Sequence, residues 1–364
     1  MPSPVVFKLR VVSPRSRDAP ARNRAHVFYI GKRPGVELNE GMYHGLFGKT
    51  SGNDFGQFDD IRETADYVHQ KTKEGTIMYR AIISLAEADA LRLGYDSKES
   101  WESLVKENIL DIAEKIGVPP SRLEYITAVH MDKGHPHVHL MLWDKEQEVK
   151  KAFVHPSISN KIRIELTKRI YRGELETLYQ IKNAARDSLM EGSSDFLQSF
   201  FEPFERMTPK DYQVALDKLK SDPEAALGRL LNKRLSSYEL DNFALKFFNF
   251  KEKLSEKGRL SYKLLPPELK SELEDIVTEL VSVNPDFCAA FEAYVNTSVE
   301  IASFYNSDPE ALEKSRQKAD DELIKRLSNK LLSLIKNIDQ RHYKSQKEQK
   351  NKSRCARVVF LDLS

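Results

Sequence analysis

Alternating apolar and polar positions predict four strands in the N-terminal part of the chain. Strands are expected where hydrophobic residues recur at every second position, or in short apolar runs bounded by turn residues. The four expected strands cover residues 5–12, 76–85, 123–132 and 137–144. The last two are joined by the short loop KGHP, which favours an adjacent antiparallel pair.

Two amphipathic helices are expected between these strands. Residues 59–74 form the first, with an aspartate at its start and an acidic first turn. Residues 99–116 form the second, because Trp101, Leu104 and Ile109 recur near helical spacing before a glycine.

After residue 155 the pattern changes to helix, with almost no strand signal. Helical segments from 196 to 340 are interrupted by prolines, and a chain of 364 residues is long enough for two domains or three. We therefore expect an α+β chain, with an N-terminal antiparallel sheet domain packed by helices and an all-α C-terminal region. The expected boundaries are 1–190, 196–340 and a basic tail at 341–364, with MEGSSD at 190–195 as a linker.

Composition excludes several classes of protein. No run of about 18 apolar residues is present, so no membrane span is expected, and the N-terminus has no signal-peptide apolar core. The two cysteines, Cys288 and Cys355, lie far apart and form no zinc or redox spacing. A cytoplasmic location is the expectation.

The near-neutral net charge of +2 hides an uneven distribution. Residues 1–50 carry nine Lys/Arg and three Asp/Glu, and residues 341–364 carry seven and two, so the two ends sum to +11 and the middle to −9. Clustered positive charge favours polyanion binding even when the total is small. A solvated tail explains the second cluster equally well.

A dense histidine cluster is the strongest chemical signal. His137 and His139 alternate with apolar residues and therefore project from one face of a strand, and the preceding strand brings His130 beside them. Three converging imidazoles form a ligand set that leaves positions on a divalent metal open for substrate and water. Surface histidines on an edge hairpin are the competing interpretation.

Two neighbours of the cluster are also candidates. Asp132 lies on the same face as His130, where it orients a ligand ring or caps the turn. His135 precedes a proline in the connection and is expected to support a ligand or contact phosphate rather than bind the metal.

The form HxDxxHPHVHxxxW resembles HUH endonucleases, and among them the conjugative relaxases of the MobP type. The segment AHVFYIGKRPGVE resembles the N-terminal tyrosine motif of that family, and IISLAEADALRLGY resembles its second motif. The resemblance covers roughly residues 1–190. It implies an initiator-like antiparallel sheet that opens on one face to single-stranded DNA.

Carried over by position, the resemblance makes Tyr29 the catalytic nucleophile. Its phenolate attacks a phosphodiester at the nick site of a transfer origin and forms a 5′-phosphotyrosyl intermediate, for plasmid or integrative-element mobilization in a bacterial cytoplasm. The implied cofactor is a divalent metal, Mn or Mg, at the three histidines. Glu87, in the second motif, is a candidate catalytic or metal-orienting residue, or simply a structural helix-start glutamate.

The basic residues around Tyr29 are candidates for DNA binding. They are Arg22, Arg24, Lys32 and Arg33, together with His135. Other expected partners are duplex DNA, accessory proteins of the relaxosome and a secretion coupling protein, and no membrane.

Several alternatives remain open from the sequence. Tyr43 is a nearby competitor for Tyr29. Tyr179 with Lys182, three residues on and on one helix face, suits a rolling-circle replication initiator, and Tyr171 lies near them. A non-catalytic DNA-binding assembly protein and a metal-dependent hydrolase unrelated to DNA are the other possibilities.

Overall fold

The computed structural model describes residues 4–361 except 52, 206, 222–237 and 255–259. The chain divides into two compact units. The sheet unit runs to Glu176 and includes Ser303–Ser307, and the helical unit contains Thr177–Ala302 and the chain from Asp308 onward. The α+β class expected from the sequence is confirmed, with the sheet first and the helices after it.

The sheet unit is built on six antiparallel strands in the order β1-β4-β6-β5-β2-β3. Their bounds are β1 Val5–Val12, β2 Phe47–Thr50, β3 Asn53–Gln57, β4 Met78–Leu85, β5 Leu123–His130 and β6 His137–Asp144. Every residue of β5 and β6 is buried, which explains why their apolar runs are so complete. The expected antiparallel hairpin is present, with His130 opposite His137 and Ala128 opposite His139.

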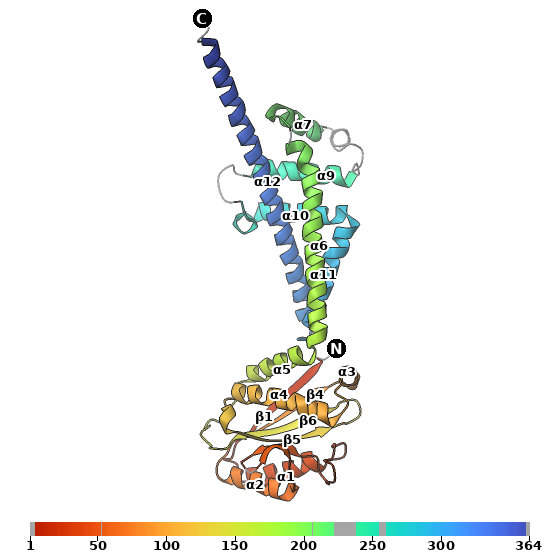
Figure 1. Ribbon diagram of the computed structural model, residues 1–364, viewed down its shortest axis with the longest axis vertical. Coiled ribbons are helices and arrows are strands. Elements are labelled where there is room, and N and C mark those ends of the chain that lie inside the picture. The colour runs from red at the N-terminus through yellow and green to blue at the C-terminus, as the bar shows by residue number, and fades with distance from the viewer. Residues whose placement is uncertain (1–3, 52, 206, 222–237, 255–259, 362–364) are drawn as a thin grey trace. The chain divides into compact units, whose positions relative to one another are not determined.

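Helices cover both faces of this sheet. Helices α1 (Ala19–Lys32) and α2 (Ile61–Lys73) lie on one side, and α4 (Lys98–Ile116) and α5 (Pro156–Ile170) lie on the other (Figure 1). The short helices α3 (Glu87–Arg92) and η1 (Pro120–Arg122) complete the unit. Apolar residues of α1 and α2 share a core with Ile126, Ala128 and Met141, so these helices pack on the face of the sheet that carries the histidines.

The sequence pattern did not reveal strands β2 and β3, nor helix α1. The buried positions of α1 are Ala19, Asn23, Val27, Ile30 and Gly31. Because two of these five are a polar residue and a glycine, the hydrophobic periodicity is weak. The predicted strand and helix ranges elsewhere differ from the observed bounds by only one or two residues at most ends.

In the helical unit, the helices α7 (Pro209–Ser221), α10 (Pro267–Val283), α11 (Pro285–Ser303) and α12 (Pro309–Leu361) each begin at a proline. Its other described elements are most of α6 (Arg172–Glu205), α9 (Tyr238–Lys253) and η2 (Tyr262–Leu264). Prolines that interrupt the sequence pattern thus occupy helix starts, where the missing N–H has no helical partner to lose. The expected linker MEGSSD lies inside α6 and is helical.

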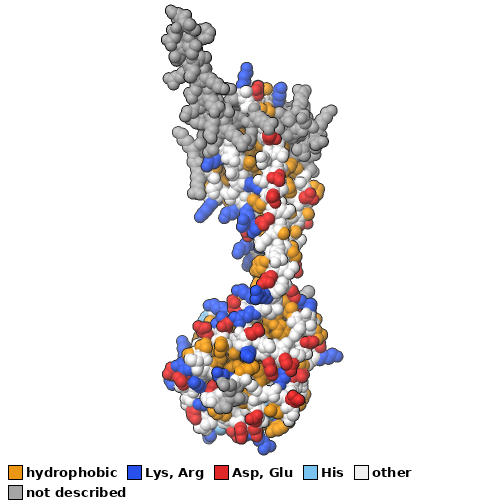
Figure 2. Space-filling view, in the orientation of Figure 1, with side chains coloured by type: hydrophobic (Ala, Val, Ile, Leu, Met, Phe, Trp, Pro, Cys, Tyr) orange, Lys and Arg blue, Asp and Glu red, His pale blue; other side chains and the backbone are white. Residues whose placement is uncertain are grey.

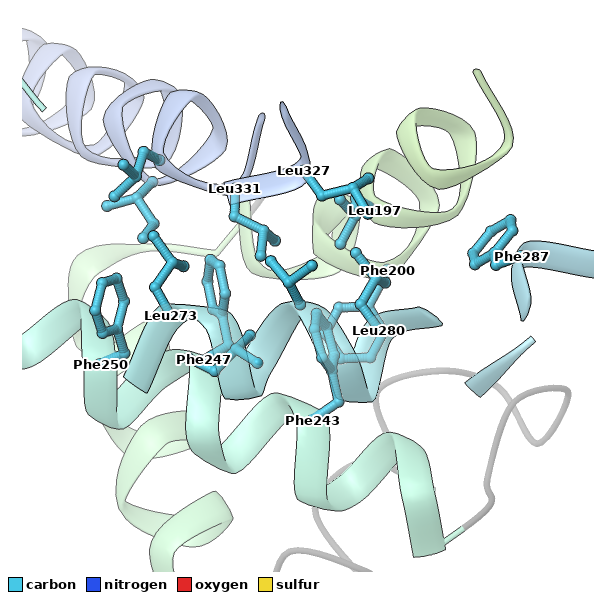
Figure 3. Packing of buried hydrophobic residues seen from close by; sticks show 14 of the residues in the cluster. Leu197, Phe200, Phe243, Phe247, Phe250, Leu273, Leu280, Phe287, Leu327 and Leu331 are labelled. Carbon is cyan, nitrogen blue, oxygen red and sulfur yellow. The ribbon is translucent and has the colours of Figure 1, made fainter. Parts of the chain in front are cut away.

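The helical unit has a core rich in phenylalanine. Phe243, Phe247 and Phe250 recur along α9 at i, i+4 and i+7 and pack against leucines of α10 and α12 (Figure 3). This spacing places all three rings on one helix face. Among the described residues no helix is both long and apolar enough to cross a membrane.

Charged side chains of both signs are intermixed on the surface of the sheet unit that Figure 2 displays. No single continuous basic patch covers the sheet unit in that view.

Candidate metal centre and neighbouring tyrosine

Three buried histidines converge at the centre of the sheet. His130 ends β5, and His137 and His139 lie on the adjacent strand β6. One ring nitrogen of each lies within 4.8 Å of those of the other two, and the ring centroids are 4.8–5.1 Å apart. The convergence that strand alternation predicts is therefore present.

Backbone carbonyls orient two of the three rings. The Nε2–H of His130 donates to the carbonyl of Ile30 at 2.8 Å, and the Nδ1–H of His137 donates to the carbonyl of His135 at 2.9 Å. His130 Nδ1 is then buried without a partner, while His137 Nε2 lies 3.2 Å from His139 Nε2. Carbonyl-anchored imidazoles with their free nitrogens directed together are the usual arrangement of histidine metal ligands, so the residues fit a divalent cation.

The environment keeps the rings of His130 and His139 neutral. Burial, together with the neighbouring histidines, lowers the pKa of His139 to about 2. Burial also lowers the pKa of His130 to about 4, against the opposing effect of its bond to Ile30. Neutral imidazole is the form that binds a metal, so no proton has to be displaced at neutral pH.

Tyr29 lies beside the histidines on α1. Its ring meets that of His139 edge to face, with centroids 6.0 Å apart, yet 48% of the residue is exposed. Arg33 Nη1 donates to the Tyr29 hydroxyl at 2.8 Å, and the other end of the same guanidinium pairs with Asp132. The hydroxyl is thus held in position while it stays open to solvent.

The segment that follows α1 is fastened to the end of β5. Val36 forms a bridge with His130, the N–H of Met131 donates to the carbonyl of Gly35 at 2.8 Å, and Gly35 has φ +90°. A Cβ on Gly35 would lie 2.0 Å from Asp132 Oδ1. Glycine is therefore required for Asp132 to reach Arg33.

His26 is a neighbour that the sequence analysis missed. Its ring stacks on Tyr29 at 5.9 Å and lies edge-on to His139 at 6.1 Å. Burial, together with the positive charges of Arg80 and Arg10, lowers its pKa to about 3. Spacing of three residues from Tyr29 on one helix is the signal that would have identified it.

Glu87 and His135 support the hairpin rather than enter the histidine cluster. A carboxylate oxygen of Glu87 accepts from the N–H of Gly134 at 2.9 Å, which fixes the turn before His137. The His135 side chain is exposed, and its backbone carbonyl is the group that orients His137. Both residues therefore help to position β6, the strand that carries His137 and His139.

Of the four basic residues named from the sequence, Arg33 is the one in contact with Tyr29. Arg24 pairs with Asp66 at 2.5 Å, and Arg22 pairs with Asp18 at 3.1 Å. The Lys32 ammonium lies over the Tyr43 ring, 4.3 Å from its centroid. Their side chains are thus directed to other parts of α1 and its surroundings.

The competing tyrosines have different surroundings. Tyr43 is exposed beneath Lys32, and Tyr171 is buried, which raises the pKa of its hydroxyl. Tyr179 belongs to the helical unit, where Lys182 lies over the Tyr294 ring at 4.7 Å. Of Tyr29 and its three competitors, Tyr29 is the one whose ring contacts a histidine of the trio, His139.

An antiparallel sheet with a buried histidine trio and an adjacent, half-exposed tyrosine defines a candidate metal-dependent site. Residues 37–200 match the family model of the MobL relaxases, and this match supports a relaxase, an enzyme that binds and nicks DNA for mobilization. No curated protein and no solved structure matches the chain. The matched segment contains all three histidines but begins after α1, so Tyr29 and Arg33 lie outside it.

Proposed function

We propose that the chain is a conjugative relaxase that nicks one DNA strand at a transfer origin through Tyr29. The observation that carries the proposal is the contact of Tyr29 with His139, with its hydroxyl fixed by Arg33. The histidine motif further suggests the MobP type within the HUH endonucleases, acting in a bacterial cytoplasm. Its DNA is single-stranded or extruded at the nick site, because the scissile phosphate has to reach the sheet.

In the proposed reaction, Tyr29 Oη attacks the scissile phosphorus. The bond between phosphorus and the 3′ oxygen breaks, the 5′-phosphate remains on the tyrosine, and the 3′ oxygen leaves as a hydroxyl after gaining a proton. The phenol proton is released to solvent through the exposed side of the ring. Arg33 fixes the attacking oxygen, and Asp132 fixes Arg33.

His130, His137 and His139 would hold a divalent cation, Mn²⁺ or Mg²⁺. When bound, the cation supplies electrostatic stabilisation of the scissile phosphate. Carbonyl oxygens of Ile30 and His135 keep two of the rings in the orientation that this role needs, and Glu87 maintains the turn between the ligand strands.

Other partners follow from the proposed activity. Duplex DNA on either side of the origin, relaxosome accessory proteins and a secretion coupling protein are candidates for the helical unit and the basic segment 341–364. Deletion of that segment is expected to weaken binding of duplex DNA and flatten its salt dependence.

Covalent trapping tests the proposal. A supercoiled plasmid carrying the DNA that flanks the gene is incubated with the protein and Mn²⁺, and the detergent-stable protein–DNA adduct is measured. Tyr29→Phe is expected to reduce the adduct roughly 1,000-fold or more, since the nucleophile is lost, and Tyr179→Phe is expected to retain it. A chelator should abolish nicking.

Three results would contradict the proposal. Loss of the adduct in Tyr179→Phe with retention in Tyr29→Phe would assign the nucleophile to the helical unit, as in a rolling-circle initiator. Metal binding without any nicking would instead favour a non-catalytic DNA-binding assembly protein. Metal-dependent hydrolysis of a substrate other than DNA would favour the unrelated hydrolase.

A further inference from the structure

The outer strands of the sheet carry basic residues on the same face as the histidines. Residues that are opposite one another in adjacent strands share a face. His139 on β6 is opposite Ile82 on β4, which is opposite Lys8 on β1. Two residues further along β6, Met141 is opposite Arg80, which is opposite Arg10. Strands are about 4.8 Å apart, so the Lys8 backbone lies about 10 Å from that of His139.

This face is open at Lys8 and Arg10. Helices α1 and α2 pack over the inner strands and over Val12 and Met78 at one end of β1 and β4. Lys8 and Arg10, on the outermost strand β1, are exposed, and Arg80 on β4 is partly buried. We call Lys8, Arg10 and Arg80 the basic strip.

The basic strip has positive charge without a matching counter-charge. Within the described part of the chain, Lys8 and Arg10 form no ion pair, and neither does Arg80. The Arg80 side chain donates instead to two neutral oxygens, the carbonyl of Arg22 at 3.0 Å and Asn23 Oδ1 at 2.6 Å, and its Nε is buried without a partner.

The electrostatic effect of this surplus is visible in neighbouring groups. Burial, together with the charges of Arg10 and Arg22, lowers the pKa of Arg80 to about 10. The charges of Arg80 and Arg10 also contribute to the low pKa of His26, the ring that stacks on Tyr29. The charges on β1 and β4 therefore act on the ring that stacks on Tyr29.

The basic residues of α1 are the alternative contacts for a DNA backbone, but their charges are more fully engaged by neighbours. Arg24 is neutralised by Asp66, and the Lys32 ammonium lies over two aromatic rings, those of Phe28 and Tyr43. Among the described residues, the basic strip therefore offers three cations without an ion pair on the histidine face, and such cations attract a polyanion.

We propose that the basic strip binds the phosphodiester backbone next to the scissile phosphate, so that the single strand crosses β4 and β1 as it leaves the histidine site. The ligand is the backbone of a single-stranded polynucleotide, and this assignment rests on the proposed relaxase function. Lys8 and Arg10 contact successive phosphates, and the charge of the partly buried Arg80 adds to the attraction for the backbone.

Binding measurements in the inactive Tyr29→Phe background test the strip. The probe is a fluorescent 20-nucleotide oligothymidylate, titrated in EDTA between 50 and 200 mM salt with anisotropy as the readout. Lys8→Gln/Arg10→Gln removes two contacts. It is expected to reduce the slope of log affinity against log salt by about 1.4, and the affinity by roughly 25-fold at 0.1 M salt.

Two further variants control the measurement. Lys8→Arg/Arg10→Lys keeps both charges and is expected to keep the slope. Lys161→Gln/Lys168→Gln removes two charges from exposed positions of α5, on the opposite face of the sheet, and is also expected to keep it.

An unchanged slope in Lys8→Gln/Arg10→Gln overturns the strip, as does an equal loss in the α5 control. The adduct assay separates this result from failure of the proposed function. If the chain with Tyr29 present forms the adduct but the salt slope does not change in Lys8→Gln/Arg10→Gln, only the proposal for the basic strip is overturned. If the chain forms no adduct, the proposed relaxase function is overturned, and the proposal for the basic strip with it.

Discussion

The two units of the molecule bury different kinds of side chain. The sheet unit buries polar groups at its centre, including the histidine trio and Glu124, whose carboxylate accepts from Trp143 Nε1 at 2.8 Å and from the Tyr67 hydroxyl at 2.9 Å. The helical unit buries phenylalanine and leucine, with Phe200, Phe201 and Phe247 fully enclosed.

This difference places the candidate metal site in the sheet unit and a largely apolar core in the helical unit. Buried polar groups are costly unless each has a partner, so a centre with an unpartnered His130 nitrogen needs a structure that holds it in place. In the described part of the helical unit no group of three or more potential metal-ligating side chains comes together. Its core therefore accounts for stability, and its role is expected to lie in its surface.

The largest expected effect is on the stability of the helical unit. Phe247→Ala removes a ring enclosed by Phe201, Phe243 and Phe248, and is expected to cost about 3–5 kcal/mol in the free energy of unfolding. Denaturant unfolding followed by circular dichroism measures this. Affinity for Mn²⁺ should be unchanged. A parallel loss of metal binding would contradict the view that the helical core and the histidine site are independent of each other.

A somewhat smaller effect is expected at the histidine centre. His139→Ala removes one of three proposed ligands and should weaken Mn²⁺ binding by about 100-fold or more, measured by isothermal titration calorimetry. His155→Ala, at an exposed histidine that caps α5, is the matched control. Equal affinities in the two variants would show that the trio does not form the metal site.

The smallest of the three effects tests the position of Tyr29, the proposed nucleophile. Gly35→Ala places a Cβ against Asp132, which displaces Arg33 and with it the Tyr29 hydroxyl, and the rate of adduct formation is expected to fall roughly 10- to 100-fold. Gly41→Ala is the control, because Gly41 also has a positive φ of +69° but open space around it. Matching rates in the two variants would mean that backbone strain alone explains the loss.

The sequence predicted the centre of the sheet better than its surroundings. His137 and His139 alternate with buried apolar residues on one strand, so their common face follows from local geometry. The pairing of Arg33 with Asp132 joins residues 99 positions apart, and no local pattern encodes it. Helix α1 was missed because Asn23 and Gly31 replace apolar residues on its buried face.

The roles of the basic residues show the same limit. Arg22, Arg24, Lys32 and Arg33 were grouped by their closeness in sequence, but the structure separates them by their partners. Arg10 and Arg80, 70 positions apart, become neighbours only through the β1–β4 register. Proximity along the chain identified a basic region, while strand pairing decides which of its charges lie on the histidine face.

The hydrogen bond from His130 to Ile30 has a consequence for how the site responds to disturbance. A carbonyl oxygen can only accept a hydrogen bond, so His130 Nε2 carries the proton and this bond selects the tautomer that leaves Nδ1 with a lone pair. The carbonyl belongs to the same turn of α1 as Tyr29, so unwinding that turn would release the tautomer and lower the affinity for a cation. Linkage is reciprocal: occupancy of the histidine trio would in turn protect this turn of α1 against amide hydrogen exchange.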